Sequence, residues 1–171
     1  MRETITKLFG ELLLSVGFDR LYAKHSNVFD EITQDSKRAQ LNGGKTTVVA
    51  IGKSAHEMTR QLAKSCSLAG DINGIVVTPY RPPEWSPILD WDLQLHVGGH
   101  PLPDQGSIDA AESALQLVSN SKEQDLTVFL VSGGASAAFE SPISTDITIE
   151  DLQQTYRMSV SYTHLTLPTK A

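Results

Sequence analysis

The sequence predicts an α/β fold, in which a parallel, Rossmann-like sheet lies between helices on both faces and forms a three-layer domain. The first observation is that short apolar runs alternate along the chain with segments of helical period, an order typical of a parallel sheet. The second is that most of these runs are continuously apolar, as in strands covered on both faces. Ligands of such sheets bind beyond the carboxyl ends of the strands, so the site is expected there.

The N-terminal part predicts two helices and a strand. Apolar positions between Ile5 and Val16 fall at helical spacing and predict an amphipathic first helix. The segment of about residues 25–44 is polar and ends in a turn signal, Asn42-Gly43-Gly44. Residues 48–51 predict a buried strand, which Gly52 ends. A second helix is expected from Ser54, and its apolar face is formed by Ala55, Met58, Leu62 and Cys66.

The second part of the chain continues the alternation. Strands are expected at residues 75–77, 93–97 and 126–131. A helix capped by Asp104 or Ser107 separates the last two of these strands. The residues of this helix that we expect to point inward are Ile108, Ala111, Ala114, Leu115 and Val118. A last helix starts after Thr148, the expected N-cap, with Asp151 at the third position of a capping box.

Length and composition indicate a globular domain with a real core. The 171 residues are 40% hydrophobic and 20% charged, with a net charge of −6, which argues against nucleic acid as the main partner. No apolar run approaches the ~20 residues of a membrane span, and no secretion signal is evident. The single cysteine, Cys66, excludes an internal disulfide. We expect a cytoplasmic protein whose partners are neither nucleic acid nor membrane.

Lys53 is the first candidate site residue. It lies between a buried strand and a helix, where the N–H groups and the dipole of the helix favour an anion. A lysine there suits a phosphate or a carboxylate, and the alternative is a solvated surface lysine. The P-loop and dinucleotide-binding patterns are both absent.

The small-residue loop Ser132 to Ser136 follows the strand at 126–131. Gly133 and Gly134 allow a ligand to approach the backbone, and successive amides can form an anion nest. The hydroxyls of Ser132 and Ser136 are possible donors, whereas the alternative is a tight turn with no ligand. The closing glycine of a nucleophile elbow is missing.

His100 is the third candidate, in the loop Gly98-Gly99-His100 that follows another strand. It is suited to act as a general base or as a donor to a carboxylate, and the alternative is a hydrogen-bonded structural histidine. Pro101 and Pro103 restrict this loop. No paired spacing of His, Cys, Asp or Glu suggests a metal site.

Four segments together resemble the N-terminal domain of the glycerate 2-kinase family, whose C-terminal part is called MOFRL. They are "VVAIGKSAHEM", "GGHPLPDQGSIDAAESAL", "LTVFLVSGGASAAFESP" and "ITIEDLQQTY". The resemblance covers about residues 1–158. One departure is Ala138-Phe139, which stands where an aliphatic pair is more usual in the family.

The resemblance implies phosphorylation of D-glycerate at its 2-hydroxyl, with ATP and Mg²⁺, to give 2-phosphoglycerate. It implies that Lys53 is an active-site residue and that the loop Ser132 to Ser136, with Gly133 and Gly134, lines the same cleft. His100 would orient glycerate. Two alternatives stay open: a hydroxypyruvate reductase, a name that some members carry, and a phosphosugar-binding module without catalysis.

The end of the chain departs from the family. Residues 160–169, "VSYTHLTLPT", match the translation of a transposase adapter used in sequencing libraries. We therefore expect an N-terminal domain at residues 1–158, an artefactual tail at residues 159–171, and a true protein that continues into a second α/β domain. The missing C-terminal domain would be a partner of this one. Without it, we expect the fragment to be inactive and part of its sheet to be exposed.

Overall fold

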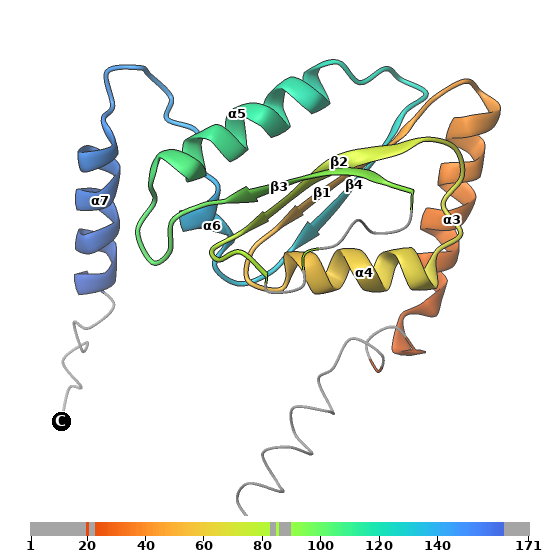
Figure 1. Ribbon diagram of the computed structural model, residues 1–171, viewed down its shortest axis with the longest axis horizontal. Helices are drawn as coiled ribbons and strands as arrows, with labels where there is room; N and C mark the ends of the chain where they lie inside the picture. The colour runs from red at the N-terminus through yellow and green to blue at the C-terminus, as the bar shows by residue number, and fades with distance from the viewer. Residues whose placement is uncertain (1–19, 21–22, 83–84, 86–89, 163–171) are drawn as a thin grey trace, which may run out of the picture.

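The computed structural model describes residues 20, 23–82, 85 and 90–162 (Figure 1). The helix expected between Ile5 and Val16 lies outside these residues. The described elements, in chain order, are α3 (Ser26–Leu41), β1 (Thr46–Ile51), α4 (Ala55–Ser65), β2 (Ile72–Thr78), β3 (Asp92–Val97), α5 (Gln105–Ser119), β4 (Leu126–Val131), α6 (Ala135–Ala138) and α7 (Ile149–Tyr162).

The four strands form one parallel sheet in the order β3-β2-β1-β4. In its register Val49 of β1 lies between Ile75 of β2 and Phe129 of β4. The four predicted strands are therefore confirmed, and so is the α/β class. Because all strands point the same way, the loops that follow them lie at one end of the sheet, where the carboxyl ends of the strands meet.

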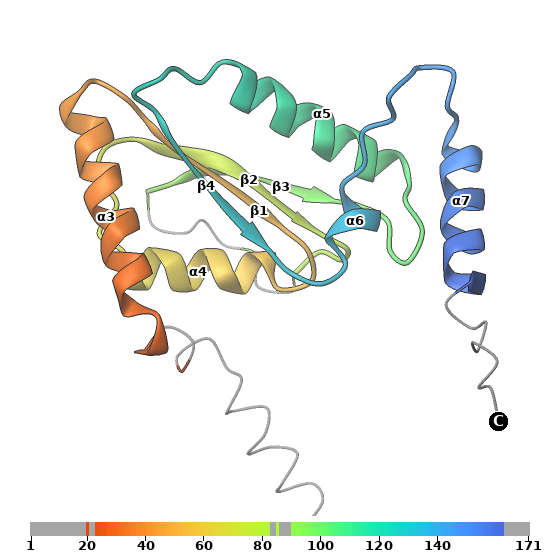
Figure 2. The same ribbon diagram turned by 180° about the vertical axis from the view of Figure 1, so that it is seen from behind.

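Helices cover both faces of the sheet, which confirms the three layers (Figures 1 and 2). Alternate residues of β1 define the two sides. Val48 packs in one core cluster with Leu62 of α4 and Phe29 of α3. Val49 packs in another with Ala110 and Ala114 of α5. Small alanines on α5 let that helix lie close to the sheet.

Helix α3 occupies the polar segment in which the sequence pattern did not predict a helix. Only two of its described residues, Ser36 and Ala39, are buried. The Ser36 hydroxyl lies 2.9 Å from that of Thr46 and accepts a hydrogen bond of 2.9 Å from the Ala69 amide. Phe29 and Ile32 of the same helix pack partly buried against the core, so the inward face mixes apolar residues with a serine, which weakens the periodic signal.

Helix α5 confirms one prediction and corrects another. Asp104 is its N-cap, and its carboxylate accepts a 3.1 Å hydrogen bond from the Ser107 amide. Leu115 was expected to point inward but is 57% exposed. Ala111 and Ala114 are buried as expected, together with Ser107 and Ala110, and Val118 packs against the same core cluster. Leu115 lies on the flank of the face that these residues form. It was predicted to be buried because the apolar residues of the helix form a wider stripe than the sheet covers.

Helix α7 starts as the sequence predicts. The Asp151 amide donates to the Thr148 hydroxyl at 3.2 Å, and the Thr148 amide donates to the Asp151 carboxylate at 3.0 Å. The bond from the Thr148 amide, and a 2.8 Å hydrogen bond from the Thr148 hydroxyl to the same carboxylate, lower the pKa of Asp151. The helix continues past residue 158 to Tyr162.

Candidate functional site

Three of the loops that leave the carboxyl ends of the strands contain the predicted site residues. The loop after β1 carries Gly52, Lys53 and Ser54, and the loop after β4 carries Ser132, Gly133 and Gly134. The loop after β3 carries Gly98, Gly99 and His100. The parallel sheet places these loops at the same edge, which is where ligands of such folds bind.

The loops after β1 and β4 are joined by hydrogen bonds. The Lys53 amide donates to the Gly133 carbonyl oxygen at 2.9 Å, and the Ser54 amide donates to the Ser132 hydroxyl at 3.0 Å. The Ser132 hydroxyl itself donates to the carbonyl oxygen of Ile51 at 3.3 Å. The amides of Lys53 and Ser54 therefore hold the neighbouring loop, and the Ser132 hydroxyl connects the two loops.

Gly52 permits this close approach. Its φ of 114° lies in a region that side chains disfavour, and a Cβ at this position would lie 2.6 Å from the Ser132 carbonyl oxygen. A glycine is therefore required at the end of β1 for both reasons.

Gly134 marks the point where the candidate residues converge. It has a φ of +84°, and a Cβ built on it would lie 3.1 Å from Cδ2 of His100 and 3.2 Å from Cε of Lys53. The side chains of Lys53 and His100 therefore flank one glycine, although the three residues come from three different loops. This is the strongest agreement between the predicted site and the geometry.

Lys53 carries a positive charge that no acidic side chain neutralises in the part of the chain that the structure describes. The ion pairs found there are Arg38–Asp35 and Arg60–Glu57. The side chain of Lys53 is exposed, while its carbonyl oxygen accepts a 2.9 Å hydrogen bond from the Tyr80 hydroxyl. The backbone of Lys53 is thus held by hydrogen bonds at both its amide and its carbonyl oxygen, and its ammonium group is available to an anion.

The His100 loop is fixed by the cap of α5. The Gly99 amide donates to the Asp104 carboxylate at 2.8 Å and to the Ser107 hydroxyl at 2.9 Å. The His100–Pro101 peptide bond is cis, and His100 itself is exposed. Asp104 therefore serves as a helix cap that also orders the loop, as the pattern favoured.

Ser136 belongs to a separate cluster with two residues that the sequence did not single out, Glu140 and Tyr156. The Tyr156 hydroxyl donates to the Glu140 carboxylate. Burial, together with this carboxylate, raises the pKa of Tyr156 to about 12, while the Ser136 hydroxyl opposes the shift. No local pattern points to this cluster, because α7 is brought to α6 only by the tertiary fold.

The described residues hold no group of three or more His, Cys, Asp or Glu side chains that could bind a metal ion. The ring of Trp85 lies against that of His56, with the ring centroids 5.2 Å apart. Burial lowers the pKa of His56, and nearby Arg60 adds to the effect.

Among the residues that the structure describes, none of the helices combines the length and the apolar character that a membrane span requires.

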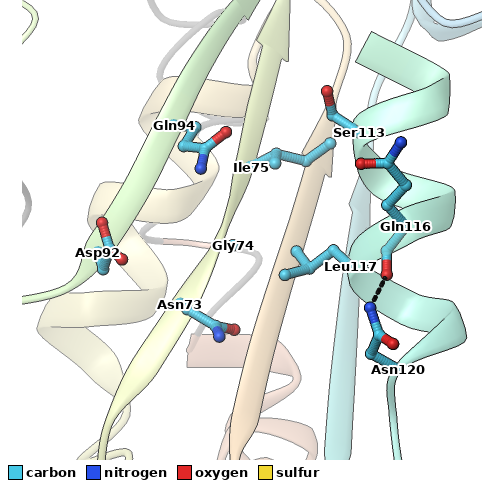
Figure 3. A pocket seen from close by; sticks show the side chains of 9 residues that line it. All are labelled: Asn73, Gly74, Ile75, Asp92, Gln94, Ser113, Gln116, Leu117 and Asn120. Atoms are coloured by element: carbon cyan, nitrogen blue, oxygen red, sulfur yellow. Dashed lines mark hydrogen bonds between the residues drawn. The ribbon is translucent and has the colours of Figure 1, made fainter. Parts of the chain in front are cut away.

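A hollow of about 300 Å³ lies away from the three loops, at the opposite ends of β2 and β3 (Figure 3). It is lined by Asn73, Gly74, Ile75, Asp92, Gln94, Ser113, Gln116, Leu117 and Asn120. Its lining has four side-chain amides, one carboxylate and no positive charge, so it does not suit a phosphate.

The chain matches a family described as "Domain of unknown function (DUF4147)" over residues 4–161. It is 33% identical over 156 residues to a glycerate 2-kinase from Pyrococcus horikoshii, covering 91% of this chain and 33% of that protein. It is 34% identical over 128 residues to a D-glycerate 2-kinase from Thermotoga maritima, covering 74% and 29%. The chain thus spans about a third of the length of these curated relatives.

Two further comparisons bear on activity and fold. A putative hydroxypyruvate reductase from Agrobacterium vitis is 33% identical over 99 residues, which cover 58% of this chain and 22% of that protein. The crystal structure of glycerate kinase from Thermotoga maritima superposes with a TM-score of 0.61 and 26% identity. That superposition covers 96% of this chain and 36% of the other.

Proposed function

The chain belongs to the DUF4147 family, and on that premise we propose that it forms part of a cytoplasmic, ATP-dependent D-glycerate 2-kinase that makes 2-phosphoglycerate. The resemblance to glycerate 2-kinases is confirmed at the level of the family by the relatives of that name. The observation that carries the proposal is the meeting of Lys53, His100 and Gly134 at the carboxyl edge of the sheet.

Lys53 supplies positive charge to the reaction. Phosphoryl transfer depends on positioning and on stabilising negative charge more than on covalent chemistry. The ammonium group has no acidic partner in the described chain, and its loop is held by the bonds to Gly133 and Tyr80. Because its backbone is held in place and its ammonium group is unpaired in the described chain, Lys53 is suited to bind the transferring phosphoryl group or the carboxylate of glycerate.

The other predicted residues have different tasks. Gly133 is exposed, with open space around the position of a Cβ, so an anion can approach the backbone there. Ser132 positions the loop that carries Lys53 through its bonds to Ser54 and Ile51. His100 orients glycerate, and Ser136 contributes a hydroxyl at the side of the cleft facing α7.

The described residues do not by themselves fit a Mg²⁺ ion. Magnesium in phosphoryl transfer is usually held by one or two carboxylates and the substrate phosphates. Of the acidic residues near the site, Asp104 caps α5 and Glu140 accepts from Tyr156. No step of the reaction proposed for this chain runs through a metal ion, and ATP is a substrate.

A hydroxypyruvate reductase is the second candidate, since relatives carry that name. The two reactions are separated by a chimera in which this chain replaces the matched third of the Pyrococcus horikoshii glycerate 2-kinase. The proposal predicts release of ADP that depends on D-glycerate. A change in nicotinamide absorbance with hydroxypyruvate, and no ADP, would favour the reductase. If the chimera binds sugar phosphates but shows neither activity, the non-catalytic binding module is favoured.

Lys53→Ala tests the assigned residue in the same chimera. We expect kcat to fall by about 10²–10³-fold, the loss typical of removing one group that stabilises charge in a transition state. The melting temperature should stay nearly unchanged, because the side chain is exposed and unpaired in the described chain. Lys64→Ala, at the other end of α4, is the matched control. An equal loss of activity and stability in Lys53→Ala would indicate a structural role instead.

A further inference from the structure

A fourth loop, the one that follows β2, also reaches the candidate site. The strand order β3-β2-β1-β4 places the loop after β1 between the loops after β2 and β4. Lys53, in the loop after β1, therefore has a neighbour on each side. It bonds to Gly133 on the β4 side and to Tyr80 on the β2 side. Of these two neighbours, only Gly133 was predicted to be a site residue.

The two bonds hold the backbone of Lys53 on both sides of its Cα atom. The Lys53 amide donates to the Gly133 carbonyl oxygen, and the Tyr80 hydroxyl donates to the Lys53 carbonyl oxygen, each at 2.9 Å. Each bond restrains one of the two rigid peptide planes that meet at this Cα atom. With both planes restrained, the direction of the Cα–Cβ bond is fixed, and the freedom that remains is that of the side-chain torsions.

This direction brings the lysine side chain beside Gly134. A Cβ built on Gly134 would lie 3.2 Å from both Cγ and Cε of Lys53 and 3.1 Å from Cδ2 of His100. Two atoms of the lysine stem thus lie against one glycine, next to the histidine. Rotation of the peptide plane that follows Lys53 would move the stem, and with it the ammonium group, relative to both residues.

Tyr80 is itself anchored to the end of β2. The hydroxyl of Thr78, the last residue of that strand, donates to the Tyr80 carbonyl oxygen. Thr78 is only 1% exposed, and its carbonyl oxygen accepts a 3.0 Å hydrogen bond from the Gly98 amide. The Tyr80 side chain is by contrast 52% exposed. Its hydroxyl can therefore be removed with little effect on stability.

We propose that Tyr80 is a positioning residue of the site and that it acts through Lys53. Its hydroxyl fixes the peptide plane that follows Lys53 and so places the ammonium group for its anion. Tyr80 itself needs no contact with a substrate. The inference rests on the proposed function, because it concerns the role that this function gives to Lys53. Placement matters in such a site, since an error of about 1 Å can cost about 10²-fold in rate.

Kinetics of the Pyrococcus chimera test the proposal. Tyr80→Phe removes the hydroxyl and keeps the ring. We expect kcat to fall about tenfold, less than in Lys53→Ala because the lysine keeps its charge. The KM for ATP should change by less than about twofold, as expected when an interaction that acts in the transition state is lost. The melting temperature should fall by less than about 3 °C. An unchanged kcat, or a fall that accompanies a large loss of stability, would overturn the proposal.

A double-mutant cycle shows whether Tyr80 acts through Lys53. In the Lys53→Ala chimera, Tyr80→Phe should lower kcat by less than about twofold, because no ammonium group is left to place. A tenfold fall in both backgrounds would overturn the proposal and show that Tyr80 acts on the substrate or on the loop as a whole.

Thr33→Val is the matched control. The Thr33 hydroxyl also donates a 2.9 Å hydrogen bond to a backbone carbonyl oxygen, that of Phe29. It belongs to α3, which lies at the end of the sheet opposite the arrowheads (Figure 1). We expect kcat of this variant to stay within about twofold of the parent. An equal fall in Thr33→Val and Tyr80→Phe would indicate a general effect on the fold and overturn the proposal.

Hydrogen exchange of the isolated 171-residue chain separates this inference from the kinase assignment. In Tyr80→Phe we expect the amides of Lys53 and Ser54 to exchange more than about fivefold faster, because their loop is then held from the β4 side alone. The amide of Val49, within β1, should be unaffected. Unchanged exchange at Lys53 and Ser54 would overturn the inference, even if the chimera is an active kinase. Faster exchange, with no D-glycerate-dependent ADP release by the chimera, would support the inference and reject the kinase assignment alone.

Discussion

At the scale of single residues, Gly134 connects the backbone of the site to its chemistry. It is the residue beside which the side chains of Lys53 and His100 come together, and its left-handed conformation is one that other residues rarely adopt. Gly133, next to it, has no such constraint, since nothing lies within 4 Å of a Cβ built there. A side chain is therefore disfavoured at Gly134 and tolerated at Gly133, and substituting each glycine in turn tests this difference.

We predict that Gly134→Ala lowers the free energy of unfolding by about 1–2 kcal/mol, the cost of a left-handed conformation for a residue with a Cβ. The new methyl group would also press on Lys53 and His100. Gly133→Ala should stay within about 0.5 kcal/mol of the parent. Urea denaturation of both variants measures the difference. Equal effects of the two substitutions would show that the Gly134 conformation does not constrain the loop.

Sequence reasoning at this scale predicted which residues belong to the candidate site, but not the contacts that each atom makes. Lys53, His100 and Gly134 were predicted separately, from small-residue loops that follow strands, and the fold brings them together. The bracing role of the Ser132 hydroxyl was not predicted. It depends on β4 lying next to β1, and strand neighbours cannot be read from the local pattern around a serine.

At the scale of elements, α7 is fastened by side-chain hydrogen bonds. The Gln153 side-chain amide donates to the Pro103 carbonyl oxygen at 2.8 Å, in the loop that carries His100. Tyr156 donates to Glu140, in the segment that follows α6. The amide of Glu140 donates in turn to the Ser107 carbonyl oxygen at 3.2 Å. The position of α7 is thus linked to the loop that carries His100 and to the segment that follows α6.

Tyr156 makes this attachment dependent on pH. Burial and the Glu140 carboxylate raise its pKa to about 12, from about 10 in an unfolded chain. The folded state therefore holds the phenolic proton more tightly. The stabilisation is complete below about pH 10 and is lost as the pH rises through about 12.

We predict that ultraviolet titration of phenolate absorbance shows a tyrosine that ionises near pH 12 and that Tyr156→Phe removes it. Glu140→Gln should move this ionisation to lower pH, because the negative charge beside the phenol is lost. A titration curve that is the same in the parent and in Tyr156→Phe would contradict the assignment.

Elements with a simple apolar period were predicted well, and those held by polar contacts were not. The four strands and the caps of α5 and α7 follow the sequence pattern. Helix α3 was not predicted because its buried residues, Ser36 and Ala39, share the inward face with the partly buried Phe29 and Ile32, and this mixed face does not form a continuous apolar stripe. Leu115 was assigned to the core because periodicity reports which residues are apolar, and not how far a helix is covered.

At the scale of the whole molecule, the order β3-β2-β1-β4 decides which surfaces are covered. The sequence predicted parallel strands with helices on both faces but not this order, because the pattern of a strand does not name its neighbours. The order makes β4 an edge, although its composition is that of an interior strand. The exposure of Phe129 and Val131 follows from that placement.

The exposure of the candidate site leads us to predict that the isolated 171-residue chain has no detectable D-glycerate-dependent ATP turnover. Lys53, His100 and Gly133 are all exposed, so water would compete for every charged contact that the reaction needs. Phosphoryl transfer requires negative charge on several oxygens to be stabilised together, and a closed site that excludes water strengthens those interactions. The chimera with the rest of the Pyrococcus protein should turn over ATP. Parallel assays that compare its rate of ADP release with that of the isolated chain measure the difference. Robust turnover by the isolated chain would contradict the prediction and show that these three loops suffice for catalysis.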